Sequence, residues 1–74
     1  MSTETMLTQL QHDLQQRYSQ KYGDVRIQFD ELIPQGDTSA RFQLSISDSL
    51  GFITRYYGTA EYQGDRLQLK TLSI

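Results

Sequence analysis

Residues 14–30 have the sequence LQQRYSQKYGDVRIQFD, and the spacing of the apolar residues changes within this stretch at Gly23. Before the glycine, apolar residues recur at intervals of three or four, as on one face of an α-helix. After it, Val25, Ile27 and Phe29 alternate with polar residues, as in a β-strand with one buried face. The stretch therefore predicts a helix that ends near Gly23 and a strand that follows it directly.

The helical spacing extends towards the N-terminus over residues 3–22. Ser2 or Thr3 can cap the first turn, and Gly23 suits the left-handed position after the last turn. The opposite face of the helix is polar and rich in glutamine, so one face is expected to be buried and the other solvated. The predicted buried stripe consists of Leu7, Leu10, Leu14, Tyr18 and Tyr22.

Towards the C-terminus, the alternation of apolar and polar residues predicts strands over residues 24–32, 39–47, 52–63 and 66–73. Clusters of turn-forming residues separate these strands. Short connections make consecutive strands antiparallel neighbours, so we expect a meander sheet in the order 1-2-3-4. The 74 residues thus predict one domain of the α+β class, with the helix stripe packed on the apolar face of the sheet.

The turns also predict how the strands are paired. A turn centred on Ser49 pairs Phe52 with Ile46, Arg55 with Gln43 and Tyr57 with Arg41. A two-residue loop at Gly64 and Asp65 pairs Glu61 with Gln68 and Thr59 with Lys70. Phe52 is expected on the buried face, and Gly58 is expected to mark a bulge or a bend in the third strand.

The composition argues against most kinds of catalytic site. The chain has no cysteine and a single histidine, His12, so a thiolate or histidine metal cluster within one chain is excluded. The glycines are scattered and form no phosphate-binding loop. Asp30 and Glu31 are adjacent and should point to opposite faces of a strand, so they are not an acid–base pair. We expect no catalytic residue, metal or cofactor, and an enzyme with an unrecognised carboxylate site is kept as an alternative.

Charge and hydropathy restrict the partners and the location. The formal net charge is −2, which argues against a dedicated double-stranded DNA-binding protein and makes nucleic acid an unlikely partner. No apolar run approaches the roughly 20 residues that span a bilayer, and residues 1–5 lack the pattern of a signal peptide. We therefore expect a cytoplasmic protein that does not bind membranes.

The polar face of the predicted sheet has a distinctive composition. The alternation places four of the seven basic residues on it, one on each strand, together with a tyrosine and an isoleucine. Arginine and tyrosine are enriched at protein interfaces. We therefore expect a small adaptor, inhibitor or accessory subunit that binds another protein through this face. The alternatives are a merely solvated face, and single-stranded nucleic acid with bases stacked on Tyr57. The candidate partner-binding residues are Arg26, Arg41, Ile53, Arg55, Tyr57 and Lys70.

The C-terminal strand contains a second candidate surface. Leu72 and Ile74 share the parity of Lys70 and not that of Leu67 and Leu69. Either a bulge turns them inwards, or they are apolar side chains exposed on an edge strand. An exposed edge of this kind favours pairing with a further strand, from a second copy in a homodimer or from another protein.

Overall fold

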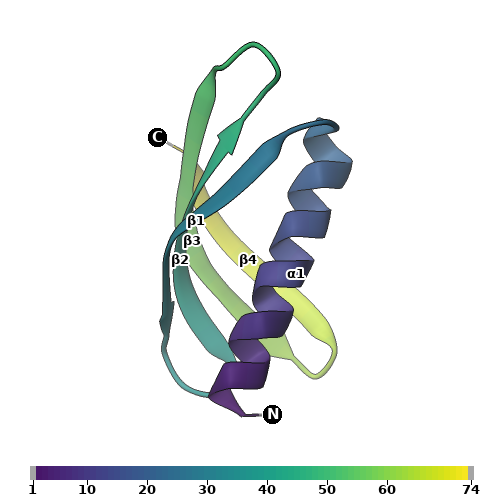
Figure 1. Ribbon diagram of the computed structural model, residues 1–74. Coiled ribbons are helices and arrows are strands. Elements are labelled where there is room, and N and C mark those ends of the chain that lie inside the picture. Colours follow the sequence, from purple (N-terminus) through teal and green to yellow (C-terminus); the bar gives the residue numbers. More distant parts are fainter. Residues whose placement is uncertain (1, 74) are drawn as a thin grey trace.

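The computed structural model describes residues 2–73. Helix α1 (Thr3–Tyr22) is followed by strands β1 (Arg26–Pro34), β2 (Ser39–Ser47), β3 (Ile53–Gln63) and β4 (Arg66–Ser73). The strands are antiparallel in the order β1-β2-β3-β4, and α1 lies against one face of the twisted sheet (Figure 1). The predicted α+β meander is confirmed. Only β1 differs appreciably from its predicted range, since it begins and ends two residues later than expected.

Helix α1 has the expected ends but a slightly different buried stripe. The Ser2 hydroxyl accepts a hydrogen bond from the Thr5 N–H, and Gly23 ends the helix with a φ of 79°. The prediction was wrong for the outer members of the stripe, because Leu7 is only half-buried and Tyr22 is 40% exposed. The stripe advances in steps of four residues, which drift by about 40° per step around a helix. It therefore slants along α1, as required where a helix crosses a twisted sheet. The buried residues are Met6, Leu10, Leu14 and Tyr18.

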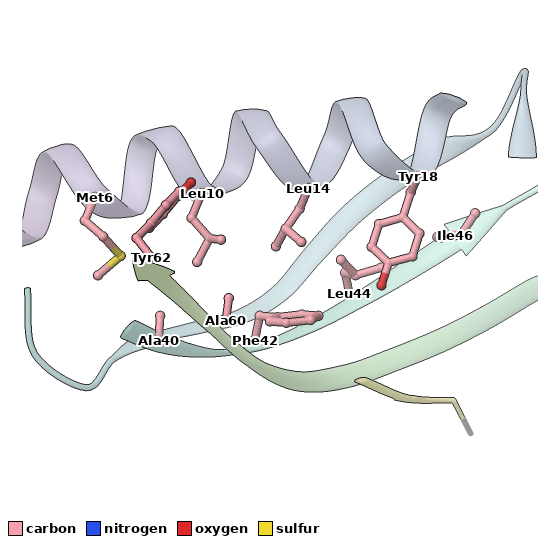
Figure 2. Close-up of a cluster of buried hydrophobic side chains, with 10 residues drawn as sticks. All are labelled: Met6, Leu10, Leu14, Tyr18, Ala40, Phe42, Leu44, Ile46, Ala60 and Tyr62. Carbon is pink, nitrogen blue, oxygen red and sulfur yellow. The ribbon is translucent and has the colours of Figure 1, made fainter. Parts of the chain in front are cut away.

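The core lies between α1 and the sheet face formed mainly by β2 and β3. Figure 2 shows the buried helix residues pointing towards this face. The predicted alternation in β2 is confirmed, since all four of its apolar residues are buried. The buried sheet residues are Ala40, Phe42, Leu44, Ile46, Ala60 and Tyr62.

Phe52 does not join this core, contrary to the prediction. It is 70% exposed and lies in the β2–β3 loop, which projects past the end of α1 (Figure 1). The loop is one residue longer than predicted, and hydrogen bonds within it constrain its backbone. The Asp48 carboxylate accepts hydrogen bonds from the N–H groups of Leu50 and Phe52, at 2.9 and 3.0 Å. The Asp48 N–H also donates to the Phe52 carbonyl at 3.0 Å, so Phe52 belongs to the turn.

This longer loop shifts the pairing of β2 with β3 by two residues from the prediction. Arg55 lies opposite Ser45, and Tyr57 lies opposite Gln43. The pairing of β3 with β4 is as predicted: Glu61 lies opposite Gln68, and Thr59 opposite Lys70.

The β-bulge in the sheet is also not at the position that the sequence suggested. The register is continuous at Gly58, so the predicted bulge there is wrong. The register shifts instead in β1 between Phe29 and Glu31, where Asp30 is the additional residue. Gly58 lies where β3 and β4 approach each other closely, because a Cβ atom at this position would lie 2.0 Å from the Lys70 carbonyl oxygen.

Candidate functional site

The face of the sheet opposite α1 carries the predicted binding residues in rows that run across the strands. One row consists of Ile33, Arg41, Thr59 and Lys70, from β1 to β4. Residues that face each other in antiparallel strands have Cβ atoms about 5 Å apart and point to the same side. The row therefore places one cation on each side of the short Thr59 side chain, Arg41 on β2 and Lys70 on β4. Ile33, which is 40% exposed, lies at the β1 end of the row.

The neighbouring row places Tyr57 in the middle of this face. It consists of Glu31, Gln43 and Tyr57, and the Tyr57 side chain is 40% exposed. Direct pairing of Tyr57 with Arg41 was predicted and is wrong, because Arg41 pairs with Thr59. The tyrosine lies diagonal to Arg41, and such diagonal neighbours remain within reach of long side chains.

These two rows enclose a shallow concavity of about 630 Å³. Its charged lining residues are Glu31, Arg41 and Lys70, and the Tyr57 ring adds apolar surface. Gly58 contributes backbone to the same concavity, where β3 and β4 approach closely. Three of the residues that line the concavity, Arg41, Tyr57 and Lys70, were candidates from the sequence, which predicted neither the other lining residues nor the concavity itself.

The remaining predicted residues lie nearer the β2–β3 loop. Arg55 is two positions from Tyr57 on the same face of β3, and Ile53, 62% exposed, is two positions further. Arg26 is opposite Ser47, which is itself opposite Ile53. The predicted pairing would have brought Arg41, Arg55 and Tyr57 into one compact cluster. In the observed register the candidate residues instead form an elongated strip with Tyr57 near its centre.

The charges are distributed unequally between this face and the rest of the molecule. Five of the seven basic residues lie at the strand positions of this face, together with three of the nine acidic residues. The face thus has a formal charge of +2, and the rest of the chain has a formal charge of −4. One of the three acids, Asp30, accepts a hydrogen bond from the Ser45 hydroxyl at 2.5 Å. The five basic residues are Arg26, Arg41, Arg55, Arg66 and Lys70.

The β2–β3 loop presents an apolar surface that the sequence analysis missed. Leu50 and Phe52 are 80% and 70% exposed, and their backbone N–H groups donate hydrogen bonds to the Asp48 carboxylate. The signal was present in the sequence, because an apolar residue at the centre of a short turn has little chance of reaching the core.

Three tyrosines meet at the C-terminal end of α1. The rings of Tyr18 and Tyr56 have centroids 5.3 Å apart, and the Tyr22 and Tyr56 hydroxyls are 2.6 Å apart. This hydrogen bond, helped by burial, raises the pKa of Tyr56 to about 12. Burial also raises the pKa of Tyr18. The raised pKa values of Tyr18 and Tyr56 make these two phenols weaker acids than a free tyrosine.

Other groups with chemical potential are dispersed. His12 is exposed on α1. Within residues 2–73 no group of three or more His, Asp or Glu side chains is arranged to hold a metal ion. The part of the chain that the structure describes contains no helix with the length and apolar character needed to span a membrane.

The predicted self-association residues cannot be placed, because Ile74 and the side chain of Leu72 lie outside the described part of the chain.

Comparisons of the chain with protein-family models, with curated proteins and with solved structures gave no match.

Proposed function

We propose that this chain is a non-enzymatic protein-binding module, an adaptor, inhibitor or accessory subunit, that binds its partner through the sheet face opposite α1. The observation that carries the proposal is the concavity whose lining combines the Tyr57 ring with the Glu31 carboxylate and the cations Arg41 and Lys70. Tyrosine and arginine are the residue types that most often dominate interface energetics, because each combines apolar area with directed hydrogen bonding.

The distribution of apolar area on this face supports the proposal. Ile33, Ile53 and Tyr57 are 40%, 62% and 40% exposed, and basic side chains lie beside or between them. Apolar groups surrounded by polar and charged ones resemble the core and rim of a protein interface. A face that served only to be solvated would have little reason to keep three large apolar side chains accessible to water.

The chemistry of the concavity fits recognition better than catalysis. It combines one carboxylate, Glu31, with the cations Arg41 and Lys70. General acid–base catalysis commonly uses two titratable groups whose environments separate their pKa values, or an imidazole. The groups gathered here are suited to binding a charged partner.

The proposal is tested by affinity capture with a variant of this face. The double variant Arg41→Ser, Tyr57→Thr should retain the fold, because both side chains are exposed. Proteins retained by the unaltered chain should be lost from the double variant and kept by the control Gln11→Ser, Gln16→Thr on the solvated face of α1. Equal recovery by all three proteins, with matching circular dichroism spectra, would remove the sheet face as the binding surface.

A further inference from the structure

The two edges of the sheet differ in their ability to accept another strand. The β1 edge is interrupted by the additional residue at Asp30 and ends at Pro34, which has no N–H group to donate. Strand β4 pairs with β3 without a shift from Arg66 to Ser73. Bulges and prolines are common ways of protecting an edge, and β4 has neither over this length. Of the two edges in residues 2–73, β4 is the one open to strand addition.

The register of the β3–β4 hairpin identifies the free backbone groups. In a two-residue hairpin the residues that flank the loop, here Gln63 and Arg66, exchange backbone hydrogen bonds, and the pattern then alternates along the strand. The N–H and C=O groups of Leu67, Leu69 and Thr71 therefore point away from β3. An incoming strand that bonds to these groups would place alternate side chains over the concavity, next to Lys70.

The side chains beside this edge favour a negatively charged occupant. Lys70 lies on β4, and Arg41 lies two strands further in, about 10 Å away in backbone position, with Thr59 between them. That separation exceeds the Debye length of about 8 Å at physiological ionic strength, so Lys70 is the cation that acts most strongly on a group placed next to it. No hydrogen bond between described side chains involves Arg41 or Lys70.

From these relationships we infer that the partner contributes an extended acidic segment, which adds to the β4 edge and places a carboxylate beside Lys70. The inference rests on the proposed function and specifies its partner. Main-chain hydrogen bonds supply the affinity of strand addition, and Lys70 selects the acidic side chain. Glu61 faces Gln68 in the row next to this site, so it disfavours a further acid two positions along the segment.

The charge distribution argues against a second copy as the occupant of this face. A two-fold dimer that stacks the face on itself would oppose two surfaces of formal charge +2. Pairing of β4 with the β4 of a second copy would bring two basic strands together, because the sequence of β4 contains Arg66 and Lys70 and no acidic residue. An acidic segment of another protein satisfies both the open edge and the positive potential.

The test is a selection of random linear peptides on the immobilised chain, followed by affinity measurements on the recovered peptides. We expect a single conserved Asp or Glu within a run of β-forming residues. Lys70→Glu should weaken these peptides by at least about tenfold. The control Lys21→Glu, the same reversal on α1, should have little effect. Replacing the acidic residue of the peptide by lysine should restore binding to Lys70→Glu.

Hydrogen exchange on the peptide complex tests the mode of binding. The amides of Leu67, Leu69 and Thr71 should become protected, and unchanged exchange at all three would overturn strand addition. If the selected peptides show no preference for an acidic residue but bind the Tyr57→Thr variant more weakly, the inference is overturned and the proposed function still stands. Tighter binding of a mixed-sequence single-stranded DNA than of any selected peptide, at the same face, would overturn both.

Discussion

The phenol of Tyr62, in β3, donates a hydrogen bond of 2.5 Å to a carboxylate oxygen of Asp13, in α1. Tyr62 is 5% exposed and lies in the core beside the N-terminal half of the helix (Figure 2). The bond satisfies the one polar group of a buried side chain and joins the helix to the sheet. Burial and the bond to Asp13 together raise the pKa of Tyr62 far above the ordinary value of 10.0.

Replacement of Tyr62 by phenylalanine should lower the free energy of unfolding by about 1–2 kcal/mol, because the change keeps the ring and removes a hydrogen bond to a charged acceptor. Urea unfolding measures the effect. The matched control is Tyr57→Phe, on the exposed face of the same strand, which should change stability by less than about 0.5 kcal/mol. Equal effects of the two substitutions would show that the bond to Asp13 contributes nothing specific.

Stability should fall at alkaline pH because the pKa values of Tyr18, Tyr56 and Tyr62 are raised in the folded state. Below pH 10 these tyrosines are protonated in both states and contribute no pH dependence. Above pH 10 the unfolded chain loses the protons that the folded chain retains, so stability declines as pH rises, and for Tyr56 this continues to about pH 12. Urea unfolding at a series of alkaline pH values should show the decline, and it should be shallower in Tyr62→Phe. A flat profile in the unaltered chain would contradict the raised pKa values.

The sequence was sufficient for the elements and their order because each is encoded by a local pattern. Helix α1 follows from its spacing and its caps, and β2 from four consecutive alternations. The bulge in β1 was not predictable, since Asp30 resembles any polar strand residue and the shift is visible only against β2. The β2–β3 register was missed because Phe52 continues the apolar alternation of β3, while the Asp48 hydrogen bonds assign it to the loop. Of the six candidate binding residues, only Arg41, Tyr57 and Lys70 line the concavity, whose existence depends on this register and was not predicted.

The position of the helix stripe can be tested with two adjacent residues. Met6 is fully buried, and Leu7 is half-buried at the edge of the core. Met6→Ala should destabilise the fold by about 2–4 kcal/mol, since it opens a cavity that the core cannot easily fill. Leu7→Ala should cost roughly 1 kcal/mol, because less of its surface is removed from water. Chemical denaturation measures the loss of stability in each variant. A larger loss for Leu7→Ala than for Met6→Ala would support the stripe predicted from the sequence.

The β2–β3 loop allows a comparable test of the Phe52 position. Because Phe52 is 70% exposed, Phe52→Thr should change the free energy of unfolding by less than about 0.5 kcal/mol. Phe42→Thr in the core, at 2% exposure, should cost several times more and serves as the comparison. A loss of about 3 kcal/mol on replacing Phe52 would instead indicate that the side chain is buried, as for a core phenylalanine.

The shape of the concavity depends on the absence of a side chain at Gly58. A Cβ atom there would lie 2.0 Å from the Lys70 carbonyl oxygen and 2.9 Å from the Thr71 Cα, both backbone atoms that cannot rotate away. Gly58→Ala must therefore move β4 relative to β3, and overpacking of this kind costs about 1–3 kcal/mol or more. The neighbouring substitution Thr59→Ala, at an exposed position, controls for changes in strand propensity and should cost less than about 0.5 kcal/mol. Thermal unfolding measures both effects, and amide chemical shifts report the displacement. Because Lys70 itself must shift, Gly58→Ala should disturb the amides from Lys70 to Thr71 more than those of the first half of β2. A Gly58→Ala variant as stable as the unaltered chain, with unchanged shifts in β4, would mean that the two strands are not held in close contact at this point.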